Sequence, residues 1–158
     1  MKYGLLILLI IIMASCFNKG DCVKSNTDLV KIAFRKKLNG KADTVTINSI
    51  FAVGYETALV NTSSDVFSTF TLNVDPNKNQ TYFIVNYTKK DYKKVVTGHT
   101  DTLKLTYRPL ARISATDCGA FLYFADLNFI KVKTGFDSIK IVNPQLLKDI
   151  TLNVQIFL

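Results

Sequence analysis

The side chains that most often carry catalysis are few and scattered in this chain. His99 is the only histidine, and its surroundings, Thr97-Gly98-His99-Thr100, predict a surface loop. A metal site needs several converging ligands, and no second histidine or cysteine lies near His99 in the sequence. Glu56 is the only glutamate and the aspartates are dispersed, so no nucleophile–base set or carboxylate pair stands out. We therefore expect no enzyme, no metal site and no cofactor.

The clearest chemical signal is a cysteine that follows an apolar segment. The run from Leu5 to Met13 comes after Lys2 and is roughly half the length of about 20 residues that a membrane span needs, which is typical of an export signal. Met13-Ala14-Ser15-Cys16 resembles the lipobox of bacterial lipoproteins, whose cysteine thiol accepts a diacylglycerol group. The alternative is an ordinary secretory signal with a chance cysteine. We predict that Cys16 is the lipidation site.

This interpretation divides the chain into three parts. Residues 1–15 are expected to be a lipoprotein signal peptide, residues 16–25 a lipid anchor with a short tether, and residues 26–158 the folded domain. Two or three acyl chains would bind a membrane far more firmly than one. Phe17 replaces the aspartate that favours inner-membrane retention in Gram-negative bacteria, and no acidic run follows. We expect anchoring in the bacterial outer membrane, with the domain facing the periplasm.

The two remaining cysteines, Cys22 and Cys118, are predicted to form a disulfide. Disulfides persist in exported proteins, and lipidation of Cys16 leaves one pair. The alternative is a reactive thiol, but Asp117 beside Cys118 would raise the thiol pKa and so disfavour the thiolate.

The positive charge of the chain would suit nucleic acid, but the expected location argues against that partner. The formal net charge is +8, and basic proteins often bind nucleic acid, but export makes that unexpected here. The basic clusters, Arg35-Lys36-Lys37 and Lys89-Lys90 with Lys93-Lys94, are expected at strand ends or in turns. Lipid phosphates and acidic glycans are the anions available in an envelope.

Alternating apolar and polar residues predict about eight strands and no helix of useful length. Asp75-Pro76-Asn77-Lys78-Asn79 predicts a turn, a strand is expected to end at Pro109, and the length of segment 119–133 predicts a bulge or bend near Asp126. Gln145 to Ile150 could form one helical turn after Pro144. The residues expected to face the core are Val30, Ile32, Phe34, Val45, Ile47, Phe70, Leu72, Val74, Phe83, Val85, Tyr87, Leu103, Leu105 and Tyr107, followed by a closing strand of Ile150, Leu152, Val154, Ile156 and Leu158.

Strands with one buried face predict an all-β, antiparallel, two-sheet sandwich of immunoglobulin-like architecture. The signature tryptophan of immunoglobulin domains is absent, so the prediction covers the architecture and not that family. A lipocalin-type barrel is the competing fold, and its strand-by-strand hairpins suit the long stretch from Ser49 to Asp65 poorly.

Three triplets share the order aspartate, hydroxyl residue, aliphatic residue: Asp43-Thr44-Val45, Asp101-Thr102-Leu103 and Asp137-Ser138-Ile139. One explanation is that aspartate and threonine suit the start of a strand.

The chain from Cys16 onwards also resembles an uncharacterised family of small lipoproteins from Bacteroidota. The likeness lies in Asp21-Cys22, Leu103-Lys104-Leu105-Thr106-Tyr107, Ile113-Ser114 before Cys118-Gly119, and the closing strand. That family has no assigned activity. The resemblance implies a phylum that attaches O-glycans at Asp-Ser/Thr-aliphatic sites, which makes Thr44, Thr102 and Ser138 candidate acceptors.

Two functions remain open at this point. The first is a non-enzymatic envelope lipoprotein whose sandwich binds a protein or glycan partner or has a structural role. The second is a periplasmic carrier of a hydrophobic ligand in a lipocalin-like barrel, which the 11 Phe and 7 Tyr could line. A filled core favours the first, and a large enclosed apolar cavity favours the second.

Overall fold

The computed structural model describes residues 28–54, 58–61, 65–90, 95–115, 119–132, 135–146 and 151–158, and these contain strands but no helix. In this part of the chain there is accordingly no helix long and apolar enough to cross a membrane. The strands are β1 (Leu29–Arg35), β2 (Val45–Ala52), β3 (Val60–Asn61), β4 (Val66–Phe67), β5 (Thr69–Asn73), β6 (Gln80–Lys90), β7 (Val96–Ala115), β8 (Gly119–Lys131), β9 (Ser138–Ile141) and β10 (Leu152–Phe157).

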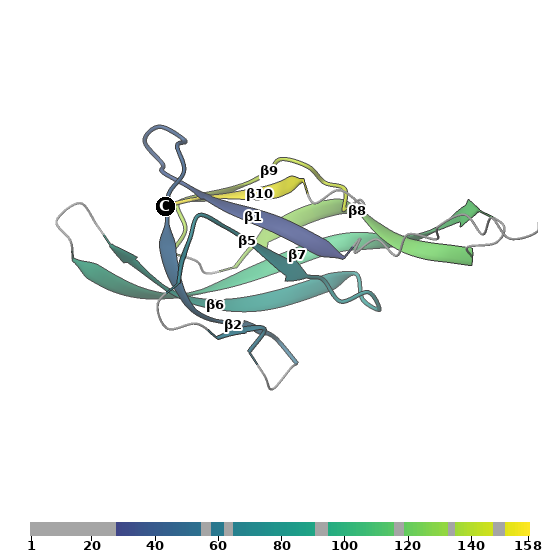
Figure 1. Cartoon of the computed structure of the whole chain (residues 1–158), viewed down its shortest axis with the longest axis horizontal. Coiled ribbons are helices and arrows are strands. Elements are labelled where there is room, and N and C mark those ends of the chain that lie inside the picture. The colour runs from purple at the N-terminus through teal and green to yellow at the C-terminus, as the bar shows by residue number, and fades with distance from the viewer. Residues whose placement is uncertain are drawn as a thin grey trace, which may run out of the picture.

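The strands form two sheets that lie face to face (Figure 1), so the all-β sandwich expected from the sequence is confirmed. One sheet has the order β5-β1-β10-β9, and the other has the order β3-β2-β6-β7-β8 with β4 paired to the start of β2. Every strand pair is antiparallel except β1 and β10, which run parallel. Parallel neighbours need a long connection, and the chain between these two strands supplies it.

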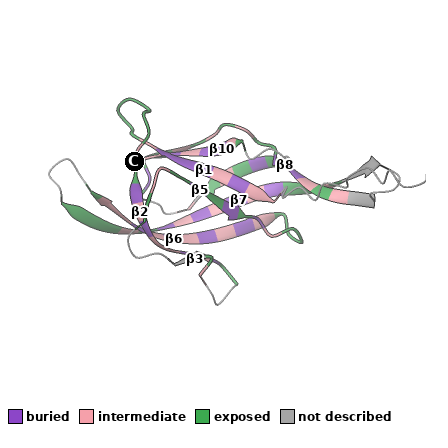
Figure 2. Cartoon of the chain, viewed as in Figure 1, coloured by how far each residue is buried: buried purple, intermediate pink, exposed green. Residues whose placement is uncertain are grey.

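Alternation along the strands places one side-chain row of each sheet in the core. Buried and half-buried residues alternate along β6, as Figure 2 shows. Phe34 of β1 contacts rings from both sheets, with centroid distances of 5.4 Å to Phe70 and 6.4 Å to Tyr87. Tyr107 meets Phe124 edge to face at 5.5 Å. Such pairs add about 0.5–1.5 kcal/mol to area burial, and the Phe34–Tyr87 pair is the one of these three that joins the two sheets.

The β7–β8 hairpin differs from the sequence expectation at one point and agrees at another. β7 does not end at Pro109 but continues to Ala115. Beyond Thr106 the described part of this strand pairs with β8 and no longer with β6. Pro109 therefore lies at an edge of the sheet, where the lack of a proline N–H costs no ladder hydrogen bond. The predicted bulge is confirmed, because the register shifts at Asp126 and Leu127, which together face Tyr107, and the φ of Asp126 is 57°.

Other local expectations were wrong or lie beyond the described residues. His99 belongs to β7, not to a loop, because β6 continues to Lys90 and pairs with it. Leu146 forms an isolated β-bridge with Phe124, so the described start of segment 145–150 is extended and not helical. The stretch from Ser49 to Asp65 holds the end of β2 and the short strand β3. With β4 just after it, the described ranges contain ten strands where about eight were expected. The signal peptide, the tether, Cys16, Cys22 and Cys118 lie outside the described residues.

Candidate functional site

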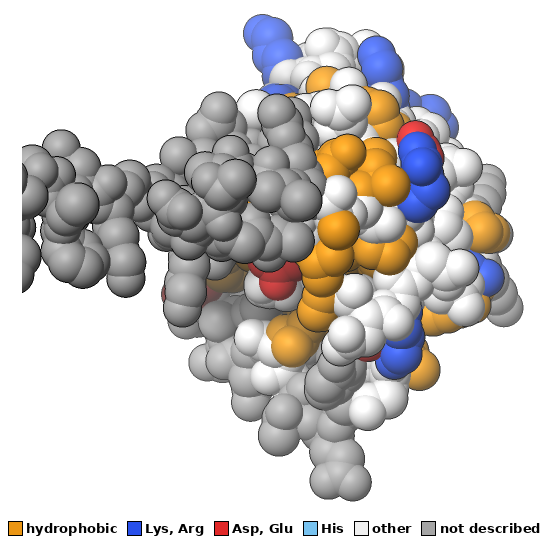
Figure 3. Space-filling model, turned by 90° about the vertical axis from the view of Figure 1, so that its right-hand side faces the viewer, with side chains coloured by type: hydrophobic (Ala, Val, Ile, Leu, Met, Phe, Trp, Pro, Cys, Tyr) orange, Lys and Arg blue, Asp and Glu red, His pale blue; other side chains and the backbone are white. Residues whose placement is uncertain are grey.

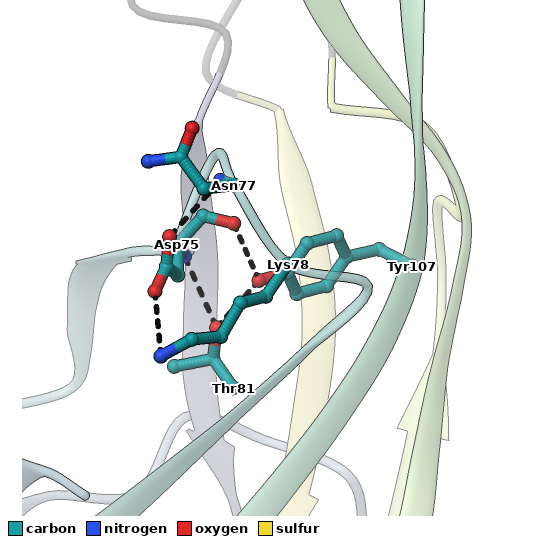
Figure 4. A network of polar contacts seen from close by, with 5 residues as sticks. All are labelled: Asp75, Asn77, Lys78, Thr81 and Tyr107. Atoms are coloured by element: carbon teal, nitrogen blue, oxygen red, sulfur yellow. Dashed lines mark hydrogen bonds and ion pairs between the residues drawn. The ribbon is translucent and has the colours of Figure 1, made fainter. Parts of the chain in front are cut away.

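The turn between β5 and β6 is a closed network of polar contacts (Figure 4). Asp75 Oδ1 accepts the Asn77 backbone N–H at 3.0 Å, and Asp75 Oδ2 pairs with Lys78 Nζ at 3.0 Å. The Tyr107 hydroxyl donates to the Asp75 carbonyl at 2.8 Å and lies 2.5 Å from Thr81 Oγ1, which in turn accepts the Asp75 N–H at 3.0 Å. The turn is therefore anchored to the buried face of β7.

These contacts shift the ionisation of two groups. The Asn77 N–H, followed by the Lys78 ammonium, lowers the pKa of the Asp75 carboxyl below its ordinary value, so the carboxylate form is favoured. Burial raises the pKa of the Tyr107 hydroxyl, which keeps it a neutral donor. The turn thus combines a negative carboxylate, whose side chain is only 9% exposed, with a neutral hydroxyl donor.

A pocket of about 220 Å³ opens beside this turn. It is lined by side chains from the end of β2, the turn and the start of β6, namely Val53, Asp75, Lys78, Gln80, Thr81 and Tyr82. The Lys104 ammonium lies 4.8 Å from the centre of the Tyr82 ring. Figure 3 views this end of the molecule and shows hydrophobic side chains gathered across the middle of the face, with lysine and arginine side chains towards its edges.

The pocket combines an aromatic ring, an amide, a carboxylate and an ammonium group around an open space. Pockets of this composition bind by ring contact and hydrogen bonding. Asp75 is already engaged by Asn77 and Lys78, and the other described lining residues add an aromatic ring, an amide and a hydroxyl group. The arrangement suits recognition of a polar partner.

A second polar cluster lies inside the sandwich, near the end where β6 passes into β7. Asp101 is 3% exposed and accepts hydrogen bonds from the Tyr87 hydroxyl at 2.8 Å and from the Gly135 N–H. The Tyr87 ring stacks on His99 at 5.1 Å and on Phe136 at 5.6 Å. Burial, followed by the bond to Asp101, raises the pKa of the Tyr87 hydroxyl, so it stays protonated.

This inner cluster fixes the segment before β9 to the sheet. A Cβ at Gly135 would lie 3.3 Å from Asp101 Oδ2, so only glycine fits there without displacing the carboxylate. Because both Asp101 oxygens are engaged, the cluster is built to hold structure. Within the described ranges, no three His, Cys, Asp or Glu side chains are placed to hold a metal ion.

The three candidate O-glycosylation residues lie in or next to three different strands. Thr44 is exposed just before β2, and Ser138 is exposed at the first position of β9. Thr102 is half-buried within β7, where it pairs with Ile84. The explanation of the triplets as strand starts is correct for two of them and wrong for Asp101-Thr102-Leu103, which lies inside a strand.

Sequence reasoning missed both polar clusters, although a signal for each was present. Phe83, Val85 and Tyr87 face inward, so Tyr82 must face the other side of β6 as an aromatic ring on the outer surface. By the same alternation, Asp101 shares the inner face of β7 with Leu103.

Comparisons with known proteins place the chain in a family without assigning it an activity. No curated protein and no solved structure matches the chain. One family model matches residues 44–158, a range that includes all the strands except β1. The chain therefore belongs to the family of unknown function DUF6452.

Proposed function

We propose that this protein is an envelope lipoprotein, lipid-anchored through Cys16 in the outer membrane, whose sandwich domain faces the periplasm and binds a protein or glycan partner without catalysing a reaction. The carrying observation is the open pocket beside Tyr82. It offers a ring and hydrogen-bonding groups to solvent at the end of the sandwich.

The packing of the interior supports a binding surface over a ligand carrier. The largest fully buried side chains include Tyr87, Phe34, Phe83 and Phe124, and rings from the two sheets meet at 6.4 Å. Interiors packed in this way have little room for a guest. A partner is therefore expected on the outside of the domain.

The binding role is tested by capture from the native envelope with chemical crosslinking. Tyr82→Ala removes the pocket ring without touching the turn network, and Lys140→Ala on the exposed side of β9 is the matched control. Tyr82→Ala should reduce recovery of the captured component at least several-fold, and the control should not. Equal capture by the two variants would contradict the assignment of the Tyr82 pocket as the binding site. A hydrophobic ligand retained in native mass spectra of the purified protein would favour the carrier.

The anchor is tested separately. Intact-mass analysis should show the loss of residues 1–15 and the addition of acyl chains at Cys16. A Cys16→Ala form that sediments with membranes as strongly as the wild type would refute lipidation.

A further inference from the structure

The loop between β1 and β2, residues 36–44, projects from the end of the sandwich opposite the Tyr82 pocket. It is the dark blue loop at the upper left of Figure 1, and Figure 2 shows it as mostly exposed. We refer to it as the Leu38 loop. Its closing contacts are backbone hydrogen bonds from Lys36 N to Lys41 O at 2.9 Å and from Gly40 N to Lys36 O at 2.8 Å. Gly40 has a φ of 67°, which a glycine adopts without strain.

Leu38 at the tip of this loop is 98% exposed, more than any other large apolar residue in the described ranges. The Asn39 side chain adds a hydrogen bond to Lys41 N at 3.0 Å, so the loop presents Leu38 in a defined turn. A fully solvated leucine on an ordered loop contributes nothing to this fold. The Leu38 side chain is therefore available to contact an apolar surface outside this protein.

Cationic side chains surround this tip. Lys36, Lys37 and Lys41 are all exposed. The end of β6 lies beside the loop, because Lys89 pairs with Asp43 at 3.0 Å. Lys37 pairs with Asp137 at 3.1 Å, so the exposed cations that the proposal uses are Lys36 and Lys41.

A second pair of apolar side chains lies on the same end of the molecule. Val95 and Val96, at the start of β7, are 56% and 61% exposed, and Val96 pairs with Lys90. Apolar side chains beside lysines match the boundary of an anionic membrane, where acyl chains lie below phosphate groups.

We propose that the Leu38 loop docks on an anionic lipid surface, with Leu38 inserted at the acyl boundary and Lys36 and Lys41 placed against the phosphates. A single apolar tip on a projecting turn favours lipid over a protein partner, because it penetrates a soft interface and offers little area to a folded surface. Leu29 lies at the other end of β1 from this loop.

The chain contains no tryptophan, so a Leu38→Trp variant provides a unique fluorophore at the tip. The full chain with this change is reconstituted in phosphatidylcholine vesicles with or without phosphatidylglycerol, and further vesicles of either composition are then added. Brominated acyl chains are placed in either the host or the added vesicles, so that contact with each membrane is detected. Val142→Trp is the control, because Val142 is 47% exposed and follows the far end of β9.

The tryptophan emission of Leu38→Trp should shift to the blue and be quenched by anionic vesicles, and 0.5 M salt should reverse both effects because the Debye length shrinks. Adding Lys36→Gln and Lys41→Gln should weaken anionic binding roughly 25-fold, at about fivefold for each charge. Val142→Trp should not respond.

Three results would overturn the proposal. One is unchanged emission with every vesicle, and another is equal quenching by neutral and anionic vesicles. The third is a photo-crosslinker at position 38 that captures an acidic protein, and no lipid, in the native envelope.

Discussion

Replacing Tyr87 with phenylalanine removes one hydroxyl from the core and leaves the ring in place. The ring contacts with Phe34, His99 and Phe136 are therefore retained. What is lost is the 2.8 Å hydrogen bond to the Asp101 carboxylate.

The cost follows from the burial of that carboxylate. Hydrogen bonds to charged groups contribute about 1.5–3 kcal/mol, and the larger values apply when the charge cannot reach water. Asp101 is 3% exposed, so we expect a loss of about 2–3 kcal/mol. The matched control is Tyr107→Phe, which removes a hydroxyl bonded only to neutral oxygens and should cost about 1 kcal/mol.

Urea unfolding followed by circular dichroism measures both variants. With a slope of about 2 kcal/mol/M, the midpoint should fall by roughly 1 M for Tyr87→Phe and roughly 0.5 M for Tyr107→Phe. Adding Asp101→Asn to Tyr87→Phe should recover part of the loss, because a buried amide costs less than a buried carboxylate. If Tyr87→Phe costs no more than Tyr107→Phe, the carboxylate does not depend on this hydroxyl and the reasoning fails.

Three further predictions address the turn, the modification sites and the cysteines. Because the folded-state pKa of Asp75 is lowered, its stabilisation is present above the ordinary value near 3.8 and is lost as pH falls through the folded pKa. The difference in unfolding free energy between wild type and Asp75→Asn should therefore shrink in acid, and a constant difference would contradict this assignment. We predict that glycopeptides from the native host carry O-glycans at the exposed Thr44 and Ser138 in preference to the half-buried Thr102, and unmodified peptides at all three would refute this. Non-reducing peptide mapping should find Cys22 linked to Cys118, and reduction should lower the free energy of unfolding by about 2–5 kcal/mol. Free alkylation of both thiols in the folded protein would contradict this pairing.

Much of the core could be predicted from alternation alone. Phe83, Val85 and Tyr87 are all buried, as are Leu103 and Leu105, because a strand with one buried face must repeat every second residue. The pairing order could not be obtained in the same way. Nothing local in β1 and β10 indicates that the two strands lie side by side and parallel.

The misplacement of His99 has a specific cause. Thr97-Gly98-His99-Thr100 has little apolar character and reads as a turn. In the structure these residues pair with the second half of β6, from Asn86 to Lys89. A polar segment can form a strand when the neighbouring strand supplies the hydrogen bonds. The apolar pattern of one strand alone contains no information about that neighbour.

The residues that shape the domain most are those at which alternation fails. Asn153 is an extra residue in β10 between the partners of Lys31 and Ile32, and its side chain turns inward to 2% exposure. There it accepts the Lys31 N–H at 3.0 Å and donates to the carbonyls of Asn143 and Gln145, replacing the ladder bonds that the bulge removes. Asp126 has the equivalent place in β8, where its bulge lies at the point at which the β7–β8 hairpin leaves the sandwich. A period-two pattern predicts that both side chains face solvent in an unbroken strand. The bulge reverses that expectation for Asn153, which is buried. Asp126 remains exposed, and the length of segment 119–133 had already indicated a bulge near it.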